Sequence, residues 1–211
     1  MKHLVIIGAR GWGREIYAAA CNTVEFHNNE YDIKGFLDDK SDAFDGLKGD
    51  YPPILGQVET YRIQPDDVFF CAMGDPIWRK KYAEIIELKG GSFISIINPT
   101  ARINPTAEIG VGTYIGTFTI VSDNVKIGRH CVFQCFNDIG HDAVTGNYVS
   151  IESYVFLGGG ALVGDMSTMH TKSSILPHKT IGKGCVVGVN SVVMKNVKDG
   201  YHVFGCPAVK I

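Results

Sequence analysis

A histidine followed directly by an aspartate, His141-Asp142, is the pair of residues in this chain best suited to proton transfer. Histidine titrates near neutral pH, so its ring can accept a proton from an attacking amine or hydroxyl, as acyl transfer requires. A nearby carboxylate can orient the ring and raise its basicity. Either Asp142 or a carboxylate brought close by folding, such as Asp138, can take that part. His141 is therefore a candidate general base, and the alternative is that it is an ordinary surface histidine.

A second group of candidate residues lies near the N-terminus. The turn Gly8-Ala9-Arg10-Gly11-Trp12-Gly13 has the spacing G-x-x-G-x-G, which differs from the dinucleotide fingerprint G-x-G-x-x-G. A glycine turn before a helix still offers backbone N–H groups to a phosphate. Asp38 and Asp39 follow a strand at its carboxyl end, where a ribose or a base is often bound. These residues predict nucleotide binding. The alternative is that the glycines only permit close packing and that the aspartates are solvated.

The elements that position His141 are indicated by a repeat of six residues. Stepping by six from Ile97 to Val193 gives seventeen positions, of which only Thr145 is polar. At 45% hydrophobic composition, chance would leave about half of them polar. Glycine often follows the apolar position, and a small residue often precedes it by two. The period fits neither a helix nor simple alternating strands, but it fits short strands joined by corners.

Three six-residue units form an 18-residue triangular coil, so this stretch predicts a solenoid of five to six coils. An ordinary β-sandwich with accidental spacing is the alternative. The segment from Val197 to Ile211 leaves the register and contains Gly205-Cys206-Pro207-Ala208, which we expect to form a lid or a return segment.

The first part of the chain predicts a small parallel α/β domain. Strands are expected at residues 4–7, 31–37, 68–73 and 93–97, with one helix beginning near Arg14. A second helix is expected after Gly74, with Asp75 as its cap and Pro76 in its first turn. The sequence therefore divides into a domain of residues 1–96 and a repeat domain of residues 97–211.

Composition narrows the class of protein. The net charge of −2 argues against a general nucleic-acid binder, although residues 170–211 hold six Lys against one Asp. The chain has no apolar stretch of the length of a membrane span and no signal-peptide pattern, so we expect a cytoplasmic protein without a membrane partner. Its six cysteines form no C-x-x-C pair, so they predict neither a zinc ribbon nor a redox motif.

Several stretches, taken in order, carry a resemblance to a known family. They are Ile6 to Glu15, Gly35 to Asp39, Met73-Gly74-Asp75 with Arg79, His141-Asp142, Leu157-Gly158-Gly159-Gly160 and Gly205-Cys206-Pro207-Ala208. In these stretches the whole chain resembles the bacterial sugar acetyltransferases that modify nucleotide-linked amino-sugars, which have relatives that O-acetylate sialic acid. The resemblance implies an α/β Rossmann-like domain followed by an all-β left-handed parallel β-helix, assembled as a homotrimer.

The resemblance also implies an activity and its residues. The chain is expected to move an acetyl group from acetyl-CoA to an amine, or a hydroxyl, of a nucleotide-activated amino-sugar, with no metal. His141 and Asp142 would be catalytic, and a backbone N–H of the Gly158-Gly159-Gly160 run would hold the developing oxyanion. The implied binding residues are Ser150, Gly159 and Gly188 for the donor, and Gly11, Trp12, Arg14, Asp38 and Asp39 for the nucleotide-sugar.

Two departures from the family keep other readings open. Trp12 stands where relatives commonly have a histidine, and Ser150 stands where they have a second histidine facing the donor. One alternative is O-acetylation of sialic acid or another sugar, and another is a nucleotide-binding scaffold without catalysis. A further alternative is a zinc enzyme like the γ-class carbonic anhydrases, with His130, His141 and His170 as ligands, but their spacings do not repeat that family's pattern.

Overall fold

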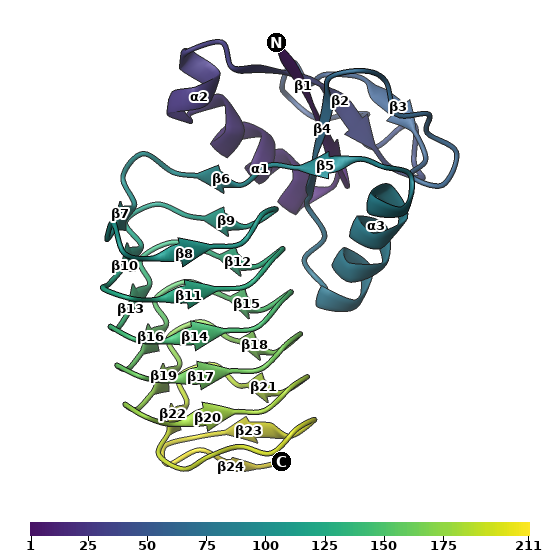
Figure 1. The fold of residues 1–211 in the computed structure, drawn as a ribbon. Coiled ribbons are helices and arrows are strands. Elements are labelled where there is room, and N and C mark those ends of the chain that lie inside the picture. The colour runs from purple at the N-terminus through teal and green to yellow at the C-terminus, as the bar shows by residue number, and fades with distance from the viewer. The chain divides into compact units, whose positions relative to one another are not determined.

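The computed structural model describes all residues from 1 to 211 and divides into two compact units, Met1–Ile96 and Ile97–Ile211 (Figure 1). The first unit is an α/β domain and the second is a parallel β-solenoid of the left-handed β-helix type. This confirms the predicted fold class.

The α/β domain is built on one five-stranded parallel sheet in the order β3-β2-β1-β4-β5. The strand β1 lies at the centre, and its residues Leu4 to Ile7 are fully buried, as expected of an apolar run in a parallel sheet. The strands are β1 (Lys2–Ile7), β2 (Tyr31–Leu37), β3 (Ile54–Gly56), β4 (Asp67–Cys71) and β5 (Ser92–Phe93). The helices are α1 (Gly11–Cys21), α2 (Val24–His27) and α3 (Pro76–Leu88).

The residues at the N-termini of α1 and α3 explain where these helices begin. In α3, the Asp75 side chain accepts a hydrogen bond from the Ile77 N–H, and Pro76 occupies the first turn, as predicted. The helix α1 begins at Gly11, earlier than the expected start near Arg14, and it has no side-chain cap. Its glycines permit this early start, because a Cβ on Gly13 would overlap the carbonyl oxygen of Gly8.

The solenoid consists of two-residue strands whose second residue points inward. Its repeat strands, from β6 to β22, begin at residue 96 and recur every six residues up to Val192–Val193. The repeat strands pair in parallel and form three sheets. The six-stranded sheet holds β7, β10, β13, β16, β19 and β22, and the five-stranded solenoid sheet holds β8, β11, β14, β17 and β20. The eight-stranded sheet holds β6, β9, β12, β15, β18 and β21, to which the C-terminal strands β23 and β24 are added. The bounds of the strands used below are β13 (Asp138–Ile139), β14 (Val144–Thr145), β15 (Ser150–Ile151), β18 (Thr168–Met169) and β21 (Val186–Val187).

Each coil lies in register with the next at a spacing of 18 residues. Val121, for example, pairs with Ile103 on one side and with Ile139 on the other. Ile139, Leu157 and Ile175 are fully buried along one column of the core. Thr145, the one polar residue of the predicted series, also points inward and is 3% exposed. The predicted six-residue register is therefore confirmed throughout.

The three sheets meet at three columns of corner residues, which we name after one member of each. The His141 corner joins the six-stranded sheet to the five-stranded solenoid sheet. The Tyr148 corner joins the latter to the eight-stranded sheet, and the Phe136 corner closes the triangle. The second residue of most corners has a positive φ, as in Asp142 (59°) and Tyr148 (59°).

The C-terminal segment leaves the register, as predicted. Val197 still bridges to Ile181, after which β23 (His202–Phe204) pairs in parallel with β21. The strand β24 (Val209–Lys210) then runs antiparallel to β23. None of the helices has the length and apolar character needed to cross a membrane.

Candidate functional site

The His141-Asp142 pair lies in the His141 corner, between β13 and β14. The Nδ1 atom of His141 is 2.7 Å from the Asp142 Oδ2 atom, and the Asn124 Nδ2 group donates to Asp142 Oδ1 over 2.7 Å. The hydrogen bonds from His141 and Asn124 lower the pKa of the Asp142 carboxyl. Asp142 is thus held as a carboxylate against one ring nitrogen, which leaves Nε2 as the nitrogen that can exchange a proton with a ligand.

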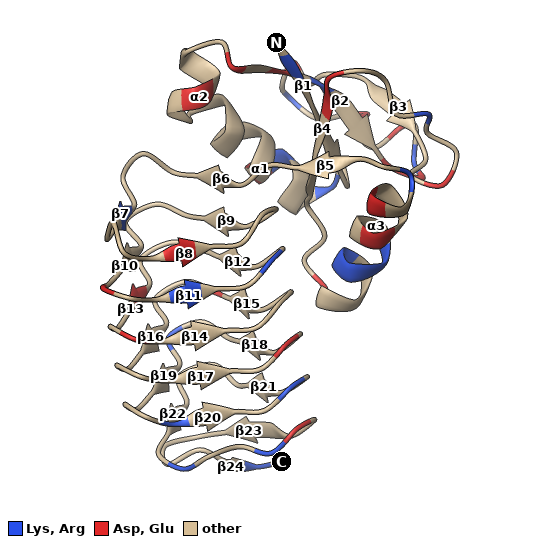
Figure 2. Cartoon of the chain, viewed as in Figure 1, with Lys and Arg blue, Asp and Glu red and all other residues tan.

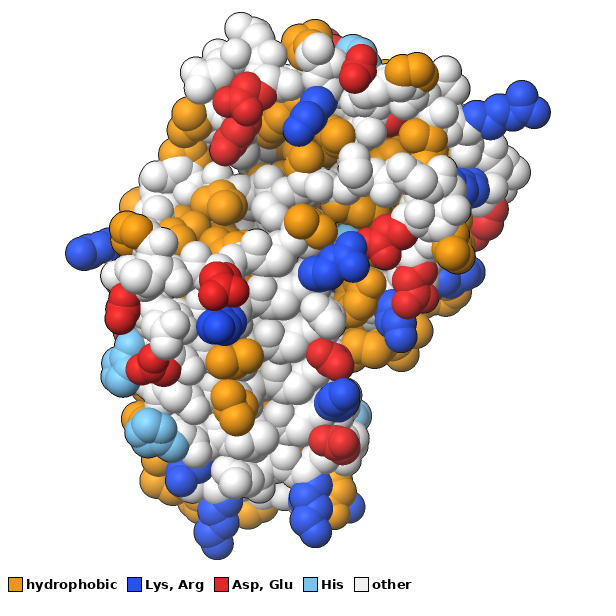
Figure 3. Space-filling model, in the orientation of Figure 1, with side chains coloured by type: hydrophobic (Ala, Val, Ile, Leu, Met, Phe, Trp, Pro, Cys, Tyr) orange, Lys and Arg blue, Asp and Glu red, His pale blue; other side chains and the backbone are white.

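Both side chains of the pair are open to solvent. The side chain of His141 is 68% exposed and that of Asp142 is 54% exposed. In Figure 3, histidine and acidic side chains lie exposed along the edge of the solenoid where these two sheets meet. Asp138, the other candidate partner, is the outward residue of β13, and it is Asp142 whose carboxylate is hydrogen-bonded to the ring.

Gly159 lies directly against the His141 ring, one coil further along. A Cβ on Gly159 would be 2.7 Å from His141 Nε2, so only glycine leaves room for the ring in this position. The carbonyl of His141 accepts a hydrogen bond from the Gly160 N–H at 2.8 Å, which fixes the two coils relative to each other. The sequence-predicted residues His141, Asp142 and Gly159 are therefore brought together.

The N–H of Gly159 has no hydrogen-bond acceptor within the chain, unlike the matching amides of the Tyr148 corner. There, Arg129 N–H donates to Asn147 Oδ1 and Asn147 N–H donates to Asp165 Oδ1, both over 2.9 Å, so each is capped by the next coil. The residue one coil beyond Gly159 is Pro177, which has no polar side chain. Next to His141, the fold thus leaves a backbone donor for a ligand.

A groove of about 680 Å³ runs beside this corner on the six-stranded sheet. His141 and Gly159 line one side of it. Its other walls include Arg102, Ile120, Asp138 and Phe156, so it combines apolar surface with charges of both signs. A groove of this kind can hold an acyl chain and an amine close to the imidazole.

Ser150 and Gly188, the other two predicted donor-binding residues, lie elsewhere on the coil. Ser150 opens β15, and Gly188 follows β21, both on the eight-stranded sheet. That sheet is the side of the triangle opposite the His141 corner. A single chain therefore does not bring Ser150 or Gly188 to His141.

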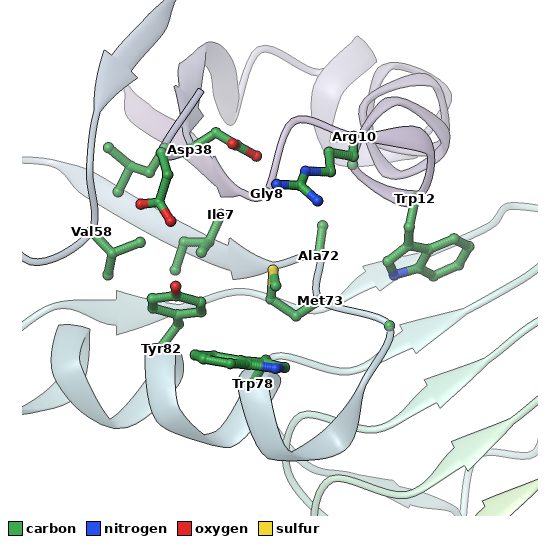
Figure 4. A pocket seen from close by; sticks show the side chains of 14 residues that line it. Ile7, Gly8, Arg10, Trp12, Asp38, Val58, Ala72, Met73, Trp78 and Tyr82 are labelled. Carbon is green, nitrogen blue, oxygen red and sulfur yellow. The ribbon is translucent and has the colours of Figure 1, made fainter. Parts of the chain in front are cut away.

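A second cavity, of about 450 Å³, lies in the α/β domain at the carboxyl ends of β1, β2 and β4 (Figure 4). Among the predicted nucleotide-binding residues, Trp12, Asp38 and Asp39 line it, together with Gly8 and Arg10 of the glycine turn. Gly11 and Arg14, which were also predicted to bind the nucleotide, are not among the lining residues.

Asp38 has both carboxylate oxygens engaged by the backbone. Its Oδ2 atom accepts a hydrogen bond from the Ala9 N–H at 2.9 Å, and its Oδ1 atom accepts one from the Lys40 N–H at 3.0 Å. Asp38 therefore ties the end of β2 to the glycine turn and occupies one amide that a phosphate would use. This leaves Asp39 as the carboxylate of the pair that is better placed to bind a ligand.

The sequence analysis did not predict an aromatic pair that lies in the wall of this cavity. Trp78 and Tyr82 project from α3 toward the cavity, and their rings are stacked with centroids 5.9 Å apart (Figure 4). Their spacing of four residues after the Asp75 cap places both on one face of a helix, so the signal was present in the sequence. Flat aromatic rings of this kind can stack against a nucleobase.

The three histidines of the zinc alternative lie on three different corners. His130 is buried in the Tyr148 corner, where its ring stacks on Tyr148 with centroids 5.2 Å apart. His170, which follows β18 in the Phe136 corner, is 2.9 Å from the Glu152 carboxylate. No cluster of three His, Cys, Asp or Glu side chains is close enough to hold a metal ion.

Parts of the chain match known proteins in sequence. Residues 3–86 match the model of the PglD N-terminal domain family. Over 119 residues the chain is 33% identical to the UDP-N-acetylbacillosamine N-acetyltransferase of Bacillus subtilis, covering 54% of this chain and 51% of that protein. The chain thus spans about half the length of this curated relative.

Solved structures share the fold over the whole chain. GDP-perosamine N-acetyltransferase of Caulobacter crescentus, in complex with CoA and GDP-perosamine, has a TM-score of 0.88 at 22% identity and covers 100% of this chain and 97% of its own. WeeI of Acinetobacter baumannii gives 0.87 at 24% identity, with 100% of both chains covered. The PglB acetyltransferase domain of Neisseria gonorrhoeae, in complex with acetyl coenzyme A, gives 0.77 at 23% identity, with 100% and 99% covered. The matched domain, the homologous relative and the shared fold together fit a hexapeptide-repeat sugar acetyltransferase, the class of protein that the sequence resembles.

Proposed function

We propose that this chain transfers the acetyl group of acetyl-CoA to an amine of a nucleotide-linked amino-sugar. The observation that carries the proposal is the arrangement at the His141 corner, where an Asp142-held imidazole lies against Gly159 and its unused N–H. Nucleophilic attack on a thioester needs a general base next to a hydrogen-bond donor for the developing oxyanion, and this corner has both.

Proton transfer falls to His141. With Nδ1 turned to the Asp142 carboxylate, Nε2 takes the proton of the acceptor amine as the amine attacks the thioester carbonyl. The carboxylate stabilises the imidazolium that results. Because the reaction joins two bound substrates, much of the rate comes from holding them in the correct position.

The N–H of Gly159 is the donor for the developing oxyanion. A preorganised amide that needs no rearrangement during the reaction is an effective source of electrostatic stabilisation. As the tetrahedral intermediate collapses, the C–S bond breaks, the amide product forms, and CoA leaves as its thiolate.

The structural relatives support acetyl-CoA as the donor, since two of them are described in complex with CoA or acetyl coenzyme A. Basic residues gather toward the last coils of the solenoid (Figure 2), where Lys172, Lys179, Lys183, Lys195 and Lys198 follow one another along the chain. Their charge suits the phosphates of CoA. A donor that is a cytoplasmic metabolite also agrees with the predicted location.

The placement of the predicted donor-binding residues supports a homotrimer. Ser150 and Gly188 lie on the face opposite His141, so they can meet the same CoA molecule only if a neighbouring chain supplies them. Exposed rings line the Phe136 corner, where Phe136 and Tyr154 stack with centroids 4.9 Å apart. Such apolar surface is typical of an interface between subunits.

The cavity of the α/β domain is the proposed site of the nucleotide part of the acceptor. Trp78 and Tyr82 offer a surface for the base, Asp39 can accept a hydrogen bond from a ribose hydroxyl, and Arg10 has the charge to bind a phosphate.

A thiol-release assay tests the proposal. Acetyl-CoA is offered with a panel of nucleotide-linked amino-sugars, with sialic acid as the hydroxyl acceptor, to wild type and His141→Ala. We expect CoA release with an amino-sugar, a loss of about 10²- to 10⁴-fold in the variant, and the same trimer mass for both by light scattering. No release with any acceptor would overturn the proposal, and release only with sialic acid would assign O-acetylation instead.

A further inference from the structure

Two imidazoles approach the same glycine pair of the His141 corner from neighbouring coils. The His141 ring lies against Gly159, as described above. The His178 ring lies against Gly160, because a Cβ on Gly160 would be 2.5 Å from His178 Nδ1. Gly159 and Gly160 therefore form the floor of a short gap, with one imidazole contributed by the coil before and the other by the coil after.

The backbone fixes this arrangement. The Gly160 N–H donates to the His141 carbonyl over 2.8 Å, and the His178 N–H donates to the Gly159 carbonyl over 3.0 Å. Asp142, Gly160 and His178 occupy equivalent positions of successive coils, with φ values of 59°, 66° and 59°. Each coil is one strand spacing of about 4.8 Å from the next, so the coils that carry His141 and His178 are about 10 Å apart, with the two glycines on the coil between them.

The proposed reaction accounts for only one of these histidines. His178 is exposed, and neither its ring nitrogens nor their protons are used by a hydrogen bond within the chain. It is close enough to Asp142 for its charge to contribute to the lowered pKa of that carboxyl. An imidazole whose nitrogens are not engaged within the chain is free to donate a proton to a bound ligand.

Charge indicates which way a bound donor points. Lys179 is next to His178, and Lys195 occupies the position of the His141 corner one coil later, whereas Asp123, Asp138 and Asp142 lie in the coils around His141. The phosphates of CoA therefore favour the side of His178. In that orientation the acetyl group faces His141 and the sulfur atom faces His178.

We infer that His178 is a second catalytic residue of this site, the general acid that protonates the departing thiolate of the acyl donor. The inference rests on the proposed function. In the step, the acceptor nitrogen forms a bond to the acyl carbon and gives its proton to His141. The C–S bond breaks, its electron pair goes to sulfur, and the His178 imidazolium transfers its proton there. Both histidines return to their starting states by proton exchange with solvent.

Changing the leaving group of the donor distinguishes an acid catalyst at His178 from a residue with a purely structural role. His178→Gln and the shorter His178→Asn remove the acid but keep a polar side chain. Each is assayed with acetyl-CoA and with acetyl-seleno-CoA, whose selenolate is the more stable anion and has less need of a proton. We expect kcat/KM to fall about 100-fold with acetyl-CoA and to stay within about 5-fold of wild type with the selenoester.

Controls separate this inference from the proposed function. His27→Gln changes an exposed histidine of α2 and should behave as wild type with both donors, and thermal unfolding verifies that every variant is folded. Equal losses of the His178 variants with the two donors, or no loss with acetyl-CoA, would overturn the role of His178. The proposed function would still stand in that case if His141→Ala were inactive. A wild-type protein inactive with both donors would remove the proposed function and this inference with it.

Discussion

The Nδ1 atom of His141 lies 2.7 Å from the Oδ2 atom of Asp142, its neighbour in the chain. The contact depends on the corner of the coil, where Asp142 has the left-handed φ of 59° and its other carboxylate oxygen is held by Asn124. The pair is adjacent in the chain, but its geometry is held by the neighbouring coils, through Asn124 on one side and Gly159 on the other.

Replacing Asp142 by Asn should lower kcat by about 10- to 100-fold, less than the loss of the base itself. The amide keeps the shape of the side chain but cannot stabilise the imidazolium. We expect the KM for acetyl-CoA to change less than about twofold, because the Asp142 carboxylate is engaged by His141 and Asn124 and does not line the groove. Steady-state kinetics check this prediction, and an unchanged kcat would show that the carboxylate has no part in catalysis.

Replacing Gly159 by Ala should reduce activity without unfolding the solenoid. The new methyl group would be 2.7 Å from His141 Nε2, so the ring must move away from its position. A displacement of about 1 Å can cost about 100-fold in rate. Gly159 is not among the glycines with a positive φ, so the backbone accepts alanine and the melting temperature should stay within a few degrees of wild type. A variant with full activity would exclude a close fit between ring and glycine.

Replacing Trp78 by Ala should weaken binding of the nucleotide-sugar. Stacking of a base on an aromatic ring contributes about 1–3 kcal/mol, so we expect its KM to rise at least about fivefold. The KM for acetyl-CoA should not change. Ile77→Ala is the matched control, since Ile77 is the neighbouring residue, is 66% exposed and does not line the cavity. Similar effects of the two substitutions would argue against a base-stacking role for Trp78.

The Glu152 carboxylate should make the stability of the solenoid depend on pH. Burial opposes its ionisation, but the hydrogen bonds with His170 and Thr171 outweigh burial and lower the pKa of Glu152 below its usual range. A group whose pKa is lower in the folded protein stabilises it above the pKa of the unfolded chain, about 4.3, and loses this contribution as pH falls through the folded value.

Comparison of wild type with Glu152→Gln provides the measurement. Urea unfolding should show wild type more stable at pH 7, with the difference shrinking progressively below about pH 4. A difference that is the same at pH 7 and at pH 3 would mean that the contribution of Glu152 does not depend on its charge.

Much of the fold could be predicted because the repeat is read directly from spacing. An inward position every six residues holds from Ile97 to Val193, and even Thr145 keeps the register, since a threonine is small enough to be buried in the core. Positions two residues earlier, such as Thr119 and Ser167, are also buried, as the pattern of small residues predicted. The element bounds of the α/β domain were less accurate. The expected strand 93–97 is divided between β5 and β6, and β3 was not expected.

The candidate site was predictable only in part. Adjacency in the chain is enough to suggest His141 with Asp142, and the 18-residue register places Gly159 beside them. Side-chain hydrogen bonds cannot be read from spacing, so the sequence did not show that Asp38 is occupied by the Ala9 and Lys40 amides. His178 was one histidine among seven until the register placed it one coil beyond Gly160.

The regular stacking of the coils sets distances along the axis of the solenoid in equal steps. Each one adds about 4.8 Å along the axis, so the number of coils between His141 and the returning strand β24 sets the reach from the reacting carbon to the far end of the protein. An insertion or deletion of 18 residues in the last coils would preserve every column above it and shift the lysines by one step. In the proposed reaction, such a change would alter the reach to the phosphates of the donor by one coil, while His141 and Gly159 keep their places.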